Sequence, residues 1–211
     1  MLFGLGVNVE KTIPKKLEDI LNQKSEETRY EVINCGVPGY NLMQEIEFLK
    51  DKIVKFNPDM AIFYVIQNDL NVKITLDEQS TLPAPQKWLI RHWMTYRFYH
   101  ILNVRKASKD KNPKRIEKVI NETRTAISDL KKISSKGMKA VFVFENRQIF
   151  EFLEKDLQHE NFYVFQLFDN PMYMNNCKNF KLAKYDGHYN IQGSLLIAKL
   201  ISKFLFVNVL Q

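Results

Sequence analysis

The sequence predicts an α/β fold in which helices cover both faces of a mostly parallel sheet. Short apolar stretches, rich in β-branched and aromatic residues, alternate along the chain with amphipathic segments of helical period. The stretch from Met60 to Ile66 is apolar almost throughout, which is typical of a parallel strand covered on both faces. A chain of 211 residues is long enough for one domain with a substantial core. We therefore expect a single three-layer α/β/α domain over residues 1–211.

The predicted helices and strands follow one another in near-regular alternation. A first helix, Thr12 to Asn22, has Pro14 in its first turn, where the missing N–H is tolerated. A helix from Asn41 to Phe56 carries an apolar stripe and ends before Pro58. The remaining expected elements are strands at Tyr30–Asn34, Met60–Ile66, Ala140–Phe144 and Phe162–Leu167, helices at Lys114–Ser134, Arg147–Leu157 and Ser194–Phe206, a loop at Tyr185–Gly193, and an aromatic-rich insertion at about 71–113.

Composition limits the classes of function and partner. The net charge is +7, from 31 Lys and Arg against 24 Asp and Glu. The densest basic run, Arg105 to Lys118, is interpreted as a solvated loop and helix face, with a nucleic-acid or anionic-membrane patch as the alternative. Cys35 and Cys177 lack the spacing of a metal site, and no Cys/His cluster accompanies them. We therefore expect no metal and no nucleic-acid partner. We also expect no membrane span, because no apolar run reaches about 18 residues.

Residues that suit acyl-ester hydrolysis lie where predicted strands end. His188 is the candidate base, and Asp186, two residues earlier, is the candidate acid that orients it. Asn68 could direct its side-chain amide at a developing oxyanion, and Gly39 could offer its backbone N–H without a Cβ in the way. Taken singly, they could instead be a turn glycine, a strand-end cap, a surface histidine and a loop acid. Because parallel strands end at one edge of a sheet, we expect them to meet there.

The segments that carry these residues resemble the sequence blocks of SGNH (GDSL-type) hydrolases. In order along the chain, NCGVPGYN at 34–41 resembles the second block, IQND at 66–69 the third, and DGHYNIQGSLLIA at 186–198 the last. The resemblance extends over essentially the whole length. It implies a flavodoxin-like sandwich and serine acyl transfer without metal or cofactor. It also implies that Gly39 and Asn68 are oxyanion donors and that His188 is the base.

The chain departs from the family pattern at several points. Gln67 stands where the family has a glycine before the asparagine. Tyr185 occupies the position of the family acid, three residues before His188, so Asp186 lies one residue closer to the histidine. The opening MLFGLGV resembles the turn that follows the family's Gly-Asp-Ser block, so Met1 falls immediately after the position of the nucleophile. No other serine lies at a strand-to-helix turn near the predicted site.

The missing block has structural as well as chemical consequences. In the family architecture, the first strand lies centrally, between the strands predicted at Tyr30 and Met60. We therefore expect the chain to lack that strand and the nucleophile, and to be inactive or nearly so as written. Our hypothesis is that the natural protein begins upstream and that both are restored there. No signal-peptide pattern follows Met1, which as written suits the cytoplasm, although an export signal could lie upstream.

The sequence leaves more than one function open. The leading hypothesis is hydrolysis of acyl esters on a carbohydrate or a lipid. An O-acyltransferase would use the same residues. A non-catalytic module that binds an acylated glycan or a partner is a further alternative, for which the aromatic stretch Trp88 to Tyr99 could supply a stacking surface.

Overall fold

A parallel sheet with helices on both faces forms the centre of the computed structural model. The structure describes the whole chain except residues 1–3, 5, 67–112, 177–178, 184–185 and 211. Three strands lie in the order β1 (Met60–Val65), β2 (Lys139–Phe144) and β3 (Phe162–Gln166), and each neighbouring pair is parallel. This confirms the predicted α/β class and three of the predicted strands. The expected insertion lies outside the described residues up to residue 112.

One face of the sheet is covered by α2 (Leu42–Phe48), α6 (Pro113–Ser134) and α7 (Arg147–Leu153). Their apolar side chains pack on Phe63, Val65, Phe142 and Phe144, which alternate with residues of the other face as the strand period requires. The helical path of α2 continues through a π-helical turn at Leu49–Ile53 and a 3-10 turn at Val54–Phe56. The predicted helix from residue 41 to residue 56 is thus one irregular helical stretch.

The opposite face is covered by α1 (Ile13–Lys24) and α9 (Ile191–Asn208), which pack on Tyr64, Val141 and Val143. A short 3-10 helix at Val9–Lys11 precedes α1. By length and composition alone, α9 could cross a membrane, and among the described helices it alone meets that test. Its buried residues contact α1 and the sheet, the situation of a core helix.

The segment at 185–193 is not the loop that the sequence predicts. Residues Asp186–Tyr189 form β5, which pairs antiparallel with β4 (Lys181–Ala183). The hairpin is short and contains Gly187, so it has no clear strand pattern in the sequence. A 3-10 turn at Leu167–Asp169 and α8 (Pro171–Asn176), which precede the hairpin, were not expected either.

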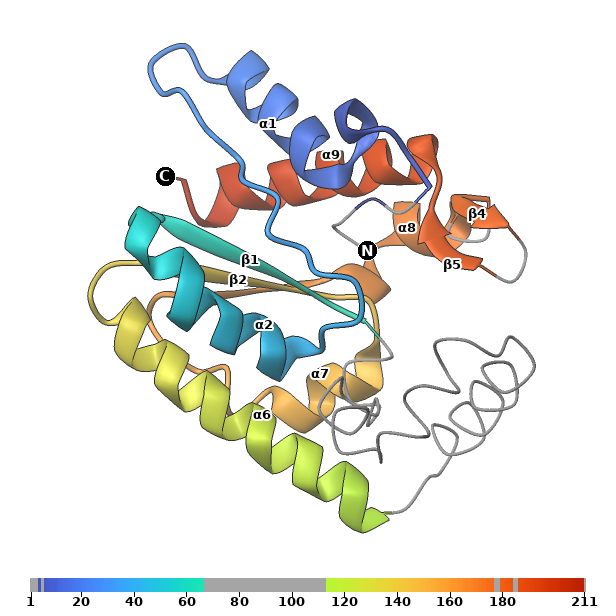
Figure 1. Cartoon of the computed structure of the whole chain (residues 1–211). Helices are drawn as coiled ribbons and strands as arrows, with labels where there is room; N and C mark the ends of the chain where they lie inside the picture. Colours follow the sequence, from blue (N-terminus) through green and yellow to red (C-terminus); the bar gives the residue numbers. More distant parts are fainter. Residues whose placement is uncertain (1–3, 5, 67–112, 177–178, 184–185, 211) are drawn as a thin grey trace, which may run out of the picture.

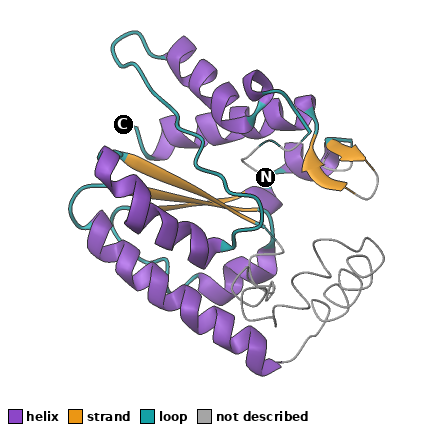
Figure 2. Ribbon diagram, in the orientation of Figure 1, coloured by secondary structure: helices purple, strands orange, loops and turns teal. Residues whose placement is uncertain are grey.

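The predicted strand at residues 30–34 belongs to no hydrogen-bonded strand pair among the described residues. Figure 2 shows it as a loop that runs alongside β1. Its backbone is held by side chains of α1 instead. The Tyr30 N–H donates to Asn22 Oδ1 at 2.8 Å, and the Val32 N–H donates to Glu18 Oε2 at 2.8 Å.

Candidate functional site

Three segments named by the sequence reach the same end of the sheet. The carboxyl end of β1, the loop that leads into α2 and the β4–β5 hairpin all lie at the right-hand end of the sheet in Figure 1. This is the edge at which ligands bind in open parallel sheets. The end of β1 and the hairpin are linked directly, because the hydroxyls of Tyr64 and Tyr189 are hydrogen-bonded at 2.9 Å.

A chain of hydroxyl groups fixes the hairpin to the sheet. The Tyr189 hydroxyl donates to that of Tyr173 at 3.1 Å, and the Tyr173 hydroxyl donates to Glu145 Oε1 at 2.5 Å. Lys181 Nζ, on β4, lies 3.1 Å from the same carboxylate oxygen and 3.9 Å from the centroid of the Tyr189 ring. We call these residues, together with Tyr64, the tyrosine–glutamate cluster. It joins β1, the end of β2, α8 and both strands of the hairpin.

The three tyrosines of the cluster are buried. Burial raises the pKa of Tyr64, Tyr173 and Tyr189, and the negative charge of Glu145 raises all of them further. The hydroxyls therefore remain protonated and keep their role as donors. Glu145 Oε2 is buried and has no hydrogen-bond partner among the described residues. The sequence analysis missed Glu145, although a glutamate directly after the apolar strand KAVFVF is an unusual feature that marks the end of β2.

His188 lies in β5, next to the buried Tyr189. Neighbouring residues of a strand point to opposite sides, so His188 points away from the face on which Tyr189 meets Tyr64. The imidazole-bearing residue is half-buried. The hairpin therefore holds the predicted base at the carboxyl end of β1, on the side of β5 that is free of the tyrosine–glutamate cluster.

Gly39 lies in an exposed turn before α2. Its φ of 92° is in the left-handed region, which glycine adopts without steric cost. Two residues later, Asn41 begins α2 with a capping box, in which its side chain accepts from the Gln44 N–H at 3.0 Å and Gln44 Oε1 accepts from the Asn41 N–H at 3.1 Å. This cap fixes the turn relative to α2.

The other predicted site residues are placed only in part. Asn68 lies outside the described residues. The backbone of Asp186 begins β5, but its side chain is outside what the structure describes. The structure therefore places Gly39 and His188 in segments at one end of the sheet, while the meeting of all four groups stays a prediction.

The Asn-x-x-Gly motif after the histidine has a structural role. Asn190 Oδ1 accepts from the Gly193 N–H at 2.9 Å and so caps α9, while Asn190 Nδ2 donates to the carbonyls of Asn179 and Lys181. A Cβ on Gly193 would lie 2.5 Å from the carbonyl oxygen of Phe180. The motif thus ties the start of α9 to the β4–β5 hairpin at close range.

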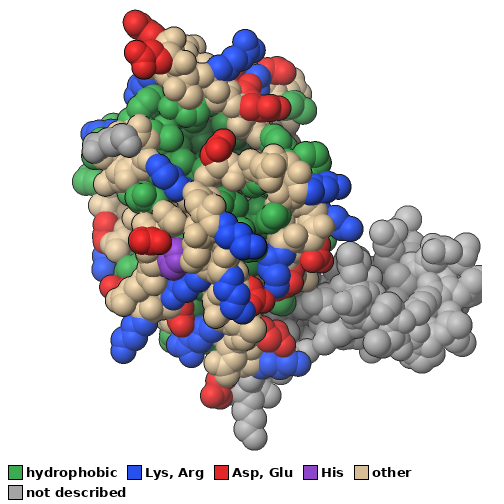
Figure 3. Space-filling model, turned by 90° about the vertical axis from the view of Figure 1, so that its left-hand side faces the viewer, with side chains coloured by type: hydrophobic (Ala, Val, Ile, Leu, Met, Phe, Trp, Pro, Cys, Tyr) green, Lys and Arg blue, Asp and Glu red, His purple; other side chains and the backbone are tan. Residues whose placement is uncertain are grey.

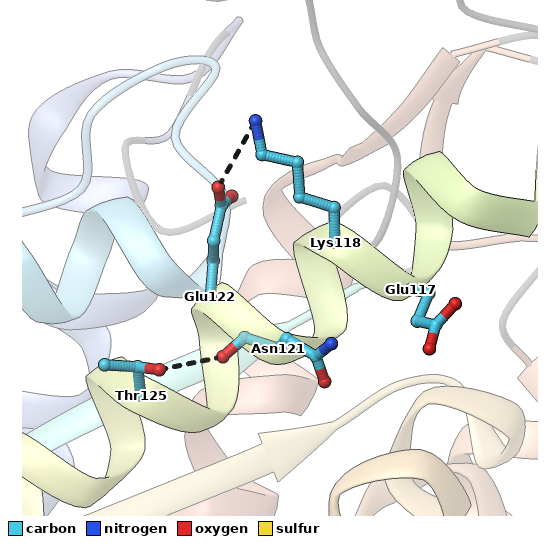
Figure 4. A pocket seen from close by; sticks show the side chains of 5 residues that line it. All are labelled: Glu117, Lys118, Asn121, Glu122 and Thr125. Carbon is cyan, nitrogen blue, oxygen red and sulfur yellow. Dashed lines mark hydrogen bonds and ion pairs between the residues drawn. The ribbon is translucent and has the colours of Figure 1, made fainter.

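Two hollows lie outside the tyrosine–glutamate cluster. A cavity of about 760 Å³ lies between β1 and residues 28–36, and apolar side chains of α1, α9 and the helical stretch at 42–56 also line it. Hydrophobic side chains gather in the upper part of the face shown in Figure 3. A shallow hollow of about 420 Å³ on α6 is lined by Glu117, Lys118, Asn121, Glu122 and Thr125 (Figure 4). Those residues belong to a single helix surface, which offers no converging groups.

Comparisons with known proteins leave the family open. No protein-family model matches the chain, and no curated protein or solved structure does either. Among the described residues, no group of three or more His, Cys, Asp or Glu side chains is placed to hold a metal ion.

Proposed function

We propose that the chain is the larger part of an SGNH (GDSL-type) hydrolase with a flavodoxin-like fold, which cleaves acyl esters on a carbohydrate or lipid by serine acyl transfer. The observation that supports this most strongly is the attachment of the hairpin to β1 through Tyr189 and Tyr64. It holds His188 at the carboxyl end of a parallel sheet, the end that the loop containing Gly39 also reaches.

In the proposed reaction, the residues act as they do in a serine esterase. His188 takes the proton of the serine hydroxyl as it attacks the ester carbonyl, and later returns a proton to the leaving alcohol. Asp186 orients the imidazole. The Gly39 N–H and the Asn68 side-chain amide donate to the oxyanion. The resemblance places the serine directly ahead of Met1, so the 211-residue chain alone should lack the acyl-transfer activity.

Labelling with a fluorophosphonate, which reacts with activated serines, tests this proposal. A version extended ahead of Met1 by a strand ending in Gly-Asp-Ser should be labelled on that serine. Changing His188→Ala should slow the labelling by about 10²–10⁴-fold, the usual contribution of a general base. His159→Ala is the matched control, because His159 contacts Ser135 beyond the end of α6 and should not matter. Equal labelling of the His188→Ala protein would exclude the proposed role.

The binding-module alternative is not favoured by any described feature. It depends on the aromatic stretch Trp88 to Tyr99, which lies outside the described residues. The O-acyltransferase alternative shares every proposed residue with the esterase, and differs only in whether water or a second alcohol accepts the acyl group.

A further inference from the structure

The described sheet ends on one side at β3, whose outer edge is accessible. β3 is hydrogen-bonded to β2, and no other described strand pairs with it. The residues from Tyr163 to Gln166 are half-buried, whereas those of β2 from Ala140 to Phe144 are fully buried. Exposed strand edges pair readily with a further strand, and native proteins normally cover or blunt them.

β3 carries none of the features that discourage such pairing. Its sequence, FYVFQ, contains no charged residue and no proline. Its register with β2 runs from Phe162 to Gln166 without a bulge. The outer edge of β1 differs, because residues 28–36 stand opposite it across the cavity of about 760 Å³. Of the two edges of the described sheet, that of β3 is the one open to a partner.

The backbone groups of β3 point alternately to β2 and to the outside. The Asn161 carbonyl accepts from the Ala140 N–H at 2.9 Å, which directs the backbone groups of Asn161, Tyr163 and Phe165 toward β2. The N–H and C=O groups of Val164, at the middle of the strand, therefore point outward.

This outward pattern is its own complement about Val164. In an antiparallel pair of two copies of β3 centred on this residue, the Val164 N–H of each copy meets the Val164 carbonyl of the other. The Gln166 N–H then meets the Phe162 carbonyl of the other copy, in both directions. The Phe162 N–H is not needed, because it donates to the His159 carbonyl of its own chain at 3.1 Å.

The same register pairs aromatic side chains. Tyr163 of each copy stands directly opposite Phe165 of the other, at a position without hydrogen bonds between the copies, where opposed side chains approach most closely. Aromatic pairs of this kind stabilise neighbouring strands. On the other face of the joined sheet, Val164 stands opposite Val164, so no charged side chains are opposed within the strand pair.

Beside β3, α9 adds apolar surface. Phe204 stacks on Phe165 at a centroid distance of 5.0 Å, so this face of α9 lies over β3. Leu196 and Leu200 precede Phe204 at spacings of four, and Val207 follows three residues later, which places all of them on one helix face. Leu196 and Phe204 are half-buried, and Val207 is 55% exposed. Two-fold symmetry about the strand pair would place both copies of α9 on one side of the joined sheet, with these faces toward each other.

We propose that β3 is the contact strand of a two-fold symmetric dimer, in which two copies of the chain join their sheets antiparallel through residues 162–166. The occupant is a second copy, because the backbone pattern and the aromatic pairs of this strand are complementary to themselves. The contact uses none of the proposed esterase residues, so the two proposals can fail separately.

Sedimentation velocity of the 211-residue chain at increasing concentration measures the dimer. Val164→Pro removes an N–H that points outward, a position at which an edge strand tolerates proline. It should raise the dissociation constant of the dimer about tenfold or more, because a hydrogen bond is lost in each direction. Ile62→Pro is the matched control, since Ile62 holds the corresponding outward position on β1, and it should leave the dissociation constant unchanged.

Charged variants test the register. Val164→Lys alone and Val164→Glu alone should each weaken the dimer, because like charges would stand directly opposite each other. An equimolar mixture of the two proteins should form a heterodimer, since opposite charges then face each other. Circular dichroism of each variant checks that the fold is retained.

Amide exchange in the unaltered chain needs no variant and decides the case if the Val164 variants fold poorly. The Val164 N–H should exchange about tenfold or more slowly at high protein concentration than at low, whereas the Phe165 N–H, which points to β2, should change less. A chain that stays monomeric at every concentration, or Val164 exchange that does not depend on concentration, would overturn the proposal. So would a dimer that Val164→Pro leaves as tight as before, or one that Ile62→Pro weakens equally.

Discussion

At the scale of single residues, the tyrosine–glutamate cluster is the feature that holds the candidate base in place. Tyr189 is both the neighbour of His188 and the centre of the hydroxyl chain between Tyr64 and Tyr173. Sequence patterns identify a histidine readily, but they do not show which residue beside it will be buried. The positive φ of Gly39, in contrast, was foreseeable from its Pro-Gly turn.

Removing the central hydroxyl of the cluster should destabilise the protein. Tyr189→Phe breaks two hydrogen bonds and leaves the Tyr64 and Tyr173 hydroxyls short of a partner, so the free energy of unfolding should fall by about 1–3 kcal/mol. Urea unfolding at neutral pH measures this loss of free energy of unfolding. Tyr163→Phe, on β3 outside the cluster, is the control and should have a smaller effect. Equal effects of the two substitutions would show that the chain of hydroxyls is not stabilising.

The wild-type protein and Tyr189→Phe should differ less in free energy of unfolding at alkaline pH. The pKa of Tyr189 is raised in the folded state, chiefly by burial, whereas an unfolded tyrosine ionises near about 10. Above that pH the unfolded state loses a proton that the folded state keeps, so the stability that Tyr189 contributes falls as pH rises. The difference between the wild-type protein and Tyr189→Phe should shrink between about pH 10 and 11 by up to about 1.4 kcal/mol. A difference that stays constant would contradict the burial of this hydroxyl.

At the scale of elements, strong periodic patterns were sufficient for most of the fold. The apolar runs of β1 and β2 and the amphipathic pattern of α6 were predictable, because each depends on the local sequence. The sequence predicted a loop where Asp186–Tyr189 forms β5, and it did not predict β4, because the hairpin is short and contains Gly187. Residues 30–34, predicted as a strand, belong to no strand pair among the described residues and are bound by side chains of α1, a non-local contact that their own sequence does not encode.

The junction between the hairpin and α9 should be intolerant of added volume. Gly193→Ala would place a Cβ 2.5 Å from the Phe180 carbonyl oxygen and 2.8 Å from its Cβ, so the backbone must shift. We expect a loss of about 1–3 kcal/mol in the free energy of unfolding, the usual cost of overpacking. Thermal and urea unfolding report it. Gln192→Ala, at the adjacent exposed position of α9, is the control, and a loss as large as that of Gly193→Ala would refute the close approach.

At the scale of the whole molecule, the chain path carries the most information. The helices α2, α6 and α7 lie on one face and α1 lies on the other, which reverses the direction of the chain at residues 28–36. The sequence predicted the α/β class correctly from alternation alone. It proposed a missing central strand only by resemblance to a family, and that strand stays a prediction.

At the scale of the whole molecule, polar groups from separate elements also gather at the carboxyl end of the sheet. Glu145, Tyr173 and Lys181 come from separate elements and meet in one network beside β1. The candidate esterase groups were expected at the same edge. Asn68 and the side chain of Asp186 lie outside the described part of the chain, so that expectation must be tested by function.

The central claim is that this sheet becomes an esterase when a strand ending in Gly-Asp-Ser precedes Met1. The most direct measurement is the hydrolysis rate of p-nitrophenyl acetate. The extended protein should turn over the ester, while the 211-residue chain, and the extended protein with its added serine changed to alanine, should remain near background. His188→Ala should lower kcat by about 10²–10⁴-fold. Equal, substantial rates in the extended and unextended proteins, or an undiminished rate in the His188→Ala protein, would contradict the account.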